Sequence, residues 1–232
     1  MIWSDPPGPL IGSGRAADIF DLDGGRVLKR DRRGHDLEFE GEIMRWAHAQ
    51  GLPVPEVHDA SGADLVMERV DGPTLLDDLS RRPWTIRSAG RRLSELHDAV
   101  HAQRAPSFVD RQVGGGDRLL HLDLHPANIV VTGHGPVIID WSNAARGDPT
   151  CDVVHAWMLL RVAAVPGPWW QRTLALVARG ALIRSFVGDR DTSAFGPALE
   201  QLLGDPSSHR LDNLGEAEIA RIEALRAELR GR

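Results

Sequence analysis

The sequence predicts an α+β protein of two lobes, a small β-rich N-terminal lobe and a larger, mostly helical C-terminal lobe. Three observations support this prediction. Short apolar segments bounded by glycine and proline fill the first seventy residues, whereas apolar residues recur at helical spacing from residue 71 onward. No internal repeat divides the 232 residues further. We therefore predict one lobe at residues 1–70, a hinge near 67–71 and a second lobe at 71–232.

The first lobe is predicted to contain a hairpin, a helix and a further strand. Asp23-Gly24 between two apolar segments is a strong hairpin signal, and it joins a strand near 18–22 to a strand that ends at Lys29. Apolar residues at helical spacing predict a helix over 36–50, with Gly51 as its C-terminal cap. The segment 64–70 is typical of a strand.

The second lobe is predicted to consist mainly of helices around one short hairpin. An apolar stripe with arginines opposite predicts a helix over 87–102. The pattern also favours helices over 151–165, 169–188 and 216–230. Between them, strands at 129–131 and 137–139 flank a glycine turn.

Composition limits the classes of partner. The net charge of −6 argues against nucleic acid and anionic membrane surfaces, because both attract basic faces. The single cysteine, Cys151, cannot form an internal disulfide, which fits a reducing compartment. The N-terminus shows no signal-peptide pattern, and the longest nearly apolar run, 153–160, is too short to span a bilayer. We expect a cytoplasmic protein.

The first lobe carries a candidate phosphate-binding loop. Gly12, Ser13 and Gly14 begin a G-x-G-x-x-A-x-I sequence, and glycines let backbone N–H groups approach an anion closely. A hairpin follows this loop, whereas a dinucleotide-binding loop would be followed by a helix. Lys29, which leaves the second strand, is expected to hold nucleotide phosphates. We expect Glu42 of the next helix to brace it, because Ile43 and Met44 follow directly, and we expect the other glutamates there to face solvent.

The second lobe carries a candidate base and metal ligands. His121-x-Asp123-x-x-x-x-Asn128 matches the catalytic loop of kinases, and Asp140-Trp141 takes the place of their D-F-G segment. A hydroxyl nucleophile needs a proton acceptor, which Asp123 provides. Magnesium prefers hard oxygen ligands, which Asn128 and Asp140 provide. The turn at 133–135 should return Asp140 to Asn128.

Two alternatives compete with this interpretation. His121, Asp123 and His125 alternate and so form a candidate metal site, which would make the protein a metal-dependent hydrolase. A non-catalytic nucleotide-binding scaffold could keep the same fold. The Pro126 break and the matching Asn128 argue against the metal site. A scaffold has no need of a base such as Asp123.

The combined motifs resemble the aminoglycoside phosphotransferase and choline-kinase-like family of small-molecule kinases. The resemblance covers "HLDLHPANIVV", "VIIDW" and "RGDPTCDVVHAW", and it runs from Gly12 to Asp152. It implies a protein-kinase-like fold that binds ATP and Mg²⁺, with Asp152 as an anchor of the catalytic loop and Asp148 as a helix cap. Adenine is expected to contact the hinge at Glu68 and Val70. Apolar walls are expected from Ile19, Val27, Val130 and Ile139.

The acceptor is expected to be a small molecule. Only residues 142–146 separate Asp140-Trp141 from the following Gly-Asp-Pro, which is too short for the activation segment that docks peptides and takes regulatory phosphates. Acidic residues after the hairpin suggest a cationic acceptor; they are Asp189, Asp191, Glu200 and Asp205. The sequence thus predicts ATP-dependent phosphoryl transfer to a hydroxyl of an aminoglycoside, amino sugar, amino alcohol or similar metabolite.

Overall fold

The computed structural model describes residues 8–14, 16–163, 169–205 and 216–230. The chain forms two compact units: residues 1–74 with 128–142, and residues 75–127 with 143–232. The sequence prediction placed the boundary near 67–71 and put the hairpin at 128–142 in the helical lobe. In the structure that hairpin packs with the β-rich unit. Within the described residues, no helix combines the length and apolarity needed to cross a membrane.

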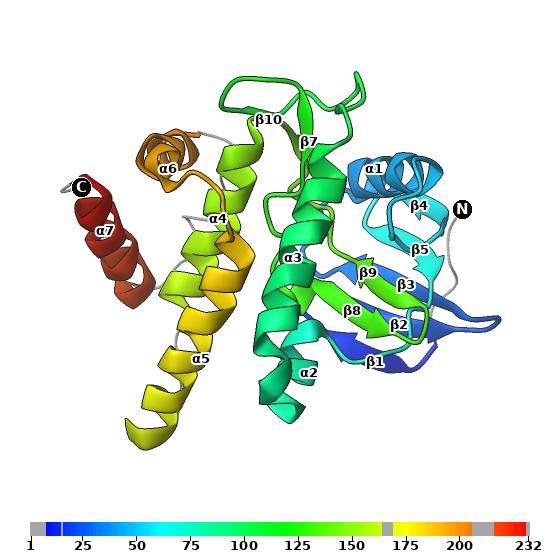
Figure 1. Cartoon of the computed structure of the whole chain (residues 1–232). Coiled ribbons are helices and arrows are strands. Elements are labelled where there is room, and N and C mark those ends of the chain that lie inside the picture. The colour runs from blue at the N-terminus through cyan, green and yellow to red at the C-terminus, as the bar shows by residue number, and fades with distance from the viewer. Residues whose placement is uncertain (1–7, 15, 164–168, 206–215, 231–232) are drawn as a thin grey trace. The chain divides into compact units, whose positions relative to one another are not determined.

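The first unit is built on a five-stranded antiparallel sheet in the order β1-β2-β3-β5-β4 (Figure 1). Its strands are β1 (Leu10–Ser13), β2 (Ala17–Leu22), β3 (Arg26–Asp31), β4 (Val57–Ser61) and β5 (Asp64–Glu68). The expected turn joins β2 to β3, and Gly24 and Gly25 both have positive φ there. Glycine adopts this conformation without steric cost, so the tight turn depends on these two residues.

Helix α1 (Glu38–Ala49) packs closely on this sheet. Its buried residues Ile43, Met44 and Ala47 form the predicted apolar face. Gly41 marks the closest approach, since a Cβ atom there would lie 2.5 Å from the Cβ of Ala60. The helix backbone can therefore lie this close to β4 only because residue 41 has no side chain.

The hairpin of β8 (Ile129–Thr132) and β9 (Gly135–Ile138) belongs to the first unit through backbone hydrogen bonds. Val131 N–H donates to the carbonyl of Pro73 at 2.9 Å. Ile138 N–H donates to the carbonyl of Pro53 at 2.7 Å. These bonds fix the two ends of the hairpin against the chain that follows α1 and β5.

The second unit is mostly helical, and α3, α4 and α5 lie side by side in it (Figure 1). Its helices are α2 (Leu75–Arg81), α3 (Ile86–His101), α4 (Pro149–Val162), α5 (Trp169–Val187), α6 (Phe195–Leu203) and α7 (Glu216–Arg230), with 3₁₀ turns at Pro83–Thr85 and Thr192–Ala194. The apolar stripe of α3 is buried as predicted. Gly90 lies where α3 meets α5. A Cβ atom added to Gly90 would lie 2.6 Å from the carbonyl oxygen of Leu182.

A three-stranded sheet in this unit was not predicted from the sequence. It contains β6 (Gln112–Val113), β7 (Arg118–Leu120) and β10 (Ala145–Gly147) in the order β6-β10-β7. Two- and three-residue strands carry too little periodicity to be recognised. The sheet matters because β7 leads directly into the 121–125 loop. A 3₁₀ turn at Pro126–Asn128 then leads into β8.

Candidate functional site

In the first unit, Lys29 is held between two carboxylates. Its Nζ lies 2.7 Å from Oε1 of Glu40 and 3.3 Å from Oδ1 of Asp140. The Glu40 side chain is buried at 3% exposure, whereas that of Asp140 is 40% exposed. Burial alone would lower the pKa of Lys29, but the carboxylates of Glu40 and Asp140 raise it above its ordinary value. Lys29 therefore stays protonated at neutral pH.

The partner of Lys29 is Glu40, and the prediction of Glu42 was wrong. Glu40 lies three and four residues before Ile43 and Met44, so it shares their buried helix face. Glu42 directly precedes Ile43 in sequence, so its side chain points about 100° away from that of Ile43 around the helix axis. Glu42 is accordingly exposed. Helical spacing was the signal that identifies Glu40; sequence adjacency misled the prediction.

Lys29 is also the only lysine among the 27 lysine and arginine residues of the chain. A compact ammonium and a planar guanidinium are not interchangeable, because a guanidinium is wider and donates in fixed directions. The narrow space between Glu40 and Asp140 suits the ammonium.

The hairpin brings the backbone of Asn128 and that of Asp140 close together, as predicted. Ile139 N–H donates to the Asn128 carbonyl at 3.0 Å, which places the two residues at the adjoining ends of β8 and β9. Asp140 has φ +64°, a conformation unusual outside glycine. Ser142 Oγ donates to Oδ1 of Asp140 at 2.9 Å. An amide and a carboxylate of this kind form a donor set of hard oxygens that fits Mg²⁺.

The glycine loop between β1 and β2 is fastened by one arginine. Ser13 Oγ donates to Oδ1 of Asp18 at 2.7 Å. Arg32 donates to Ser13 Oγ at 2.7 Å, to Asp18 Oδ1 at 2.8 Å and to the Gly14 carbonyl at 2.6 Å. These hydrogen bonds lower the pKa of Asp18, and the bond from Ser13 has the largest effect. This cluster was not predicted, because Arg32 lies outside every motif recognised in the sequence.

The register of the sheet puts several predicted nucleotide contacts on one face. Ile19 pairs with Lys29 and Asp21 with Val27, so Ile19, Val27 and Lys29 project from the same side of β2 and β3. Val27 and Val130 are buried, Ile19, Val70 and Ile139 are half-buried, and Glu68 is exposed. All of them lie in the first unit, and contact of these residues with adenine stays a prediction.

In the second unit, Asp123 lies in a tightly anchored loop. Leu122 has φ +54°, and the N–H groups of His121 and Leu122 both donate to the Asp152 carboxylate at 2.8 Å. His101 Nε2 lies 2.9 Å from the same carboxylate. Burial opposes the charge of Asp152, yet His101 and the other nearby histidines hold its pKa below the usual range. An ionised, fully buried Asp152 thus fixes the strained turn before Asp123.

Asp148 accepts a hydrogen bond from Thr150 N–H at 2.8 Å and caps the first turn of α4. That turn carries Asp152. The two aspartates therefore act together on the local structure: one caps the helix, and the other binds the loop.

The alternating His121, Asp123 and His125 do not form a metal centre. Among the described residues, no group of three or more His, Cys, Asp or Glu side chains is arranged to hold a metal ion. Instead, His125 Nδ1 accepts from Ala127 N–H at 3.2 Å, and its Nε2 lies 3.1 Å from Oδ1 of Asp123. The geometry therefore gives no support to the metal-dependent hydrolase.

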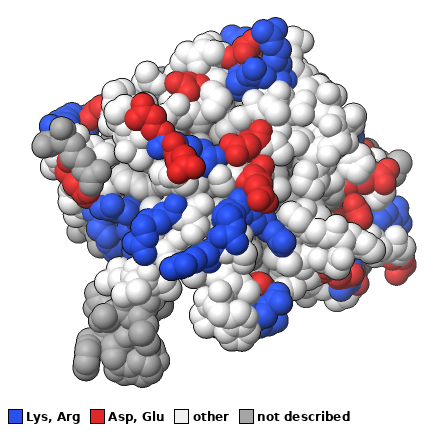
Figure 2. Space-filling model, in the orientation of Figure 1, with Lys and Arg blue, Asp and Glu red and all other residues white. Residues whose placement is uncertain are grey.

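The acidic residues expected to form a cationic-acceptor pocket are mostly engaged. Glu200 pairs with Arg226 and Arg230, and Asp205 pairs with Arg111 at 2.9 Å. Asp191 caps a 3₁₀ turn. Figure 2 shows basic side chains gathered in a band on one face of the molecule, with acidic side chains beside it. Arginines thus neutralise Glu200 and Asp205, so these acids do not select a cationic acceptor by charge alone.

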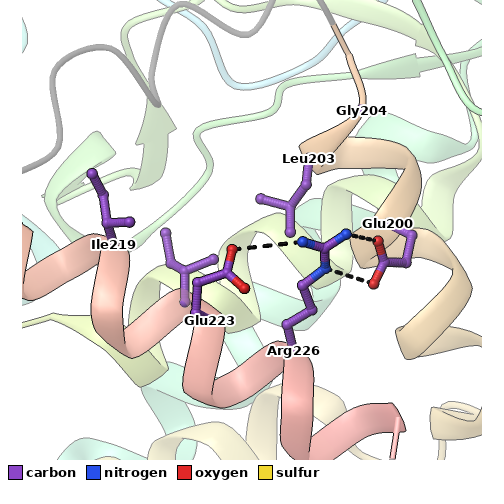
Figure 3. Close-up of a pocket in the computed structure, with 7 residues that line it drawn as sticks. Glu200, Leu203, Gly204, Ile219, Glu223 and Arg226 are labelled. Carbon is purple, nitrogen blue, oxygen red and sulfur yellow. Dashed lines mark hydrogen bonds and ion pairs between the residues drawn. The ribbon is translucent and has the colours of Figure 1, made fainter.

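A hollow of about 350 Å³ lies between α6 and α7 (Figure 3). Arg226 crosses it and contacts Glu200 and Glu223. The other lining residues are Leu203, Gly204, Ile219 and Ile222. None of them belongs to the 121–125 loop or to the strands that flank it.

The arrangement defines a class of protein. A β-sheet lobe with a glycine loop and a lysine–glutamate pair, followed by a helical region whose loop presents Asp123, is the protein-kinase-like fold. The chain belongs to the phosphotransferase enzyme family, whose sequence model matches residues 9–118 and 100–195.

Solved structures share this fold. A choline/ethanolamine kinase family protein from Mesorhizobium loti is 16% identical, with a TM-score of 0.56 over 97% of this chain and 87% of that one. A thermostable mutant of aminoglycoside phosphotransferase APH(4)-Ia, in a ternary complex with AMP-PNP and hygromycin B, is 18% identical, with a TM-score of 0.54 over 94% and 92% of the two chains.

A curated relative matches part of the chain. The probable bifunctional tRNA threonylcarbamoyladenosine biosynthesis protein of Methanoculleus marisnigri is 26% identical over an alignment of 166 residues, and the match covers 62% of this chain. The match covers 28% of that protein, so the chain corresponds to a small part of it.

Proposed function

We propose that the protein transfers the γ-phosphoryl group of ATP to a hydroxyl of a small molecule, in the class of aminoglycosides, amino sugars, amino alcohols and similar metabolites. The observation that carries the proposal is the placement of Lys29 between Glu40 and Asp140. A buried ammonium held by one inner and one half-exposed carboxylate suits the binding of polyphosphate next to a metal ligand. A non-catalytic nucleotide-binding scaffold would have no need of a proton acceptor such as Asp123 in addition to these residues.

Each residue has a distinct role in this proposal. Lys29 and the loop from Gly12 to Gly14 hold the phosphates. Asn128 and Asp140 would hold Mg²⁺, which when bound neutralises charge on the phosphate oxygens. The Asp123 carboxylate accepts the proton of the acceptor hydroxyl. The hydroxyl oxygen then forms a bond to the γ-phosphorus as the bond from that phosphorus to the bridging oxygen breaks, and ADP leaves.

A small acceptor fits the length of the chain after Asp140. Asn143 supplies a carbonyl to Arg111, and β10 begins at Ala145. No residues remain in this stretch for a peptide-docking segment, so activity should be present without prior phosphorylation.

Nucleotide binding can be tested without an acceptor. Mg-ATP at about 100 times its dissociation constant should stabilise the protein by roughly 2.7 kcal/mol. Because Lys29 is the only lysine, amine acetylation followed by peptide mass spectrometry reports on one side chain. Mg-ATP should protect Lys29 and adenosine should not. A Lys29→Arg variant provides the blank. Unchanged melting together with unprotected Lys29 would exclude the nucleotide assignment.

Transfer is tested with a panel of aminoglycosides, amino sugars, amino alcohols and nucleosides, with ATP consumption as the readout. With the acceptor found, Asp123→Asn should lower kcat by about 10²–10⁴-fold and leave Mg-ATP affinity unchanged, because it removes only the proton acceptor. Asp140→Asn should lower affinity and rate together. Near-full turnover by Asp123→Asn would refute the base, and unchanged metal dependence in Asp140→Asn would refute the ligand role.

A further inference from the structure

The glycine loop is fastened from the face of the sheet that points away from Lys29. Directly opposed residues of antiparallel strands project to the same face, and successive residues of one strand project to opposite faces. Ser13 pairs with Asp18, and the next residue of β2, Ile19, pairs with Lys29. The Ser13 hydroxyl, which donates to Asp18 Oδ1 at 2.7 Å, is therefore engaged on the face opposite to the Lys29 ammonium.

Arg32 joins this pair of side chains to the backbone of the loop. Its Nη1 donates to Ser13 Oγ at 2.7 Å and to Asp18 Oδ1 at 2.8 Å, and its Nη2 donates to the Gly14 carbonyl at 2.6 Å. The backbone N–H of Arg32 donates to the Ala16 carbonyl at 2.9 Å. One residue thus holds the loop at two points, Gly14 through its side chain and Ala16 through its backbone.

Arg32 is itself held by the turn that follows β3. Asp31 is buried at 7% exposure, and its Oδ1 accepts from Arg33 N–H at 2.8 Å and from His35 N–H at 3.0 Å. These bonds fix the backbone on both sides of Arg32. Since Lys29 lies three residues earlier on the same strand, the loop is tied to the strand that carries the ammonium.

We propose that Arg32 is a positioning residue that fixes the glycine loop before nucleotide binds, so that the loop meets the phosphates already ordered. This inference rests on the proposed function, in which the loop holds the phosphates of ATP. Arg32 acts through the backbone of Gly14 and Ala16 and is not itself a phosphate ligand. A loop ordered in advance strengthens binding, because less conformational entropy is lost when the complex forms.

Two substitutions separate this role from simple attraction between a cation and polyphosphate. Arg32→Met removes a positive charge and the bonds to the loop together. Asp18→Ala removes a negative charge, so attraction alone would make Mg-ATP bind more tightly, whereas loss of the bonds from Ser13 and Arg32 should make it bind more weakly. Arg33→Met is the matched control, because it removes the same charge from the adjacent exposed position and leaves the loop bonds in place.

Calorimetry with Mg-ATP and with adenosine distinguishes the possibilities. Arg32→Met and Asp18→Ala should each weaken Mg-ATP binding by about tenfold, because binding must then order the loop. Adenosine, which has no phosphates, should bind both variants as it binds the wild type, and Arg33→Met should change neither affinity. Unchanged or tighter Mg-ATP binding by Asp18→Ala would overturn the proposal. Equal losses for Mg-ATP and adenosine would also overturn it, because the whole sheet would then be disturbed.

A second measurement needs no nucleotide. Gly14 N–H donates to the Ala17 carbonyl at 2.8 Å within the loop. Hydrogen exchange of this amide, followed by NMR in the full-length protein, should be about tenfold faster in Arg32→Met, because local opening no longer breaks the side-chain bonds of Arg32. Equal exchange in Arg32→Met and the wild type would overturn the proposal whatever the affinities. If the wild type binds no Mg-ATP, the proposed function fails, and Gly14 exchange still decides whether Arg32 fixes the loop.

Discussion

At the scale of single residues, the first unit depends on a buried ion pair. Lys29 and Glu40 have side-chain exposures of 12% and 3%, so water screens neither charge well. Removing one partner of such a pair leaves the other charge buried without compensation, which costs far more than the pair contributes in water. Asp140 offsets part of that cost, because it also contacts Lys29.

Glu40→Gln should therefore lower the free energy of unfolding by about 3 kcal/mol, at the low end of the range for breaking buried pairs. Glu42→Gln changes the same residue type two positions further along the same helix, where the side chain is exposed, and should stay within about 0.5 kcal/mol of the wild type. Urea unfolding at neutral pH compares the two. Equal losses in both variants would contradict the assignment of Glu40.

At the scale of elements, close backbone approach decides where helices pack. Gly41 brings α1 onto β4, and Gly90 brings α3 onto α5. At Gly90 the obstructing atoms include the Leu182 carbonyl oxygen at 2.6 Å and Ser185 Cβ at 2.7 Å. Backbone atoms of a packed helix cannot move aside as a flexible side chain can, so the helix pair must separate to admit a methyl group.

Gly90→Ala should destabilise the protein by about 1–3 kcal/mol through overpacking. Gly180→Ala on α5 is the matched control. Its new Cβ would meet only the end of the Arg184 side chain at 3.4 Å, so the usual helix preference should stabilise the protein by about 0.5–1 kcal/mol. Opposite shifts in melting temperature are expected, of roughly 2–4 °C per kcal/mol. Shifts of the same sign would show that α3 and α5 do not approach at Gly90.

At the scale of the whole molecule, two buried histidines contribute to the acid stability. Burial lowers the pKa of His97 to about 4 and that of His155 to about 4. His97 Nδ1–H donates to the Leu93 carbonyl at 2.8 Å. A neutral ring has a single N–H proton, and this hydrogen bond uses it. Both histidines bind protons in the unfolded chain near pH 6.5 and bind them in the folded chain only near pH 4.

The sign of the pH dependence follows from these depressed values. The stability that each histidine contributes is fully present above pH 6.5 and is lost as the pH falls to about 4, a loss of about 3 kcal/mol for each. In His97→Phe the decline in unfolding free energy between pH 7 and about pH 4.5 should be smaller than in the wild type by about 2 kcal/mol. His134→Gln, on the exposed hairpin turn, should decline as the wild type does. An unchanged decline in His97→Phe would contradict the prediction.

Much of this protein could be read from the sequence. The two-lobed α+β class, the β2–β3 hairpin, the stripe of α3 and the β8–β9 hairpin all rest on local patterns, because periodicity and turn chemistry act over a few residues. The spacing from Asp123 to Asn128 and the position of Asp140 indicated the proposed chemistry for the same reason: the candidate base and metal ligands lie in one continuous segment.

Tertiary structure decided the rest. The choice of Glu40 over Glu42, the neutralisation of Glu200 by Arg226 and the fastening of Ser13 by Arg32 all join residues that are distant in sequence. The assignment of the 128–142 hairpin to the first unit depends likewise on bonds to Pro53 and Pro73. Local sequence patterns specify which side chains are available, whereas which charges meet depends on how separate elements pack, and only the folded chain determines that packing.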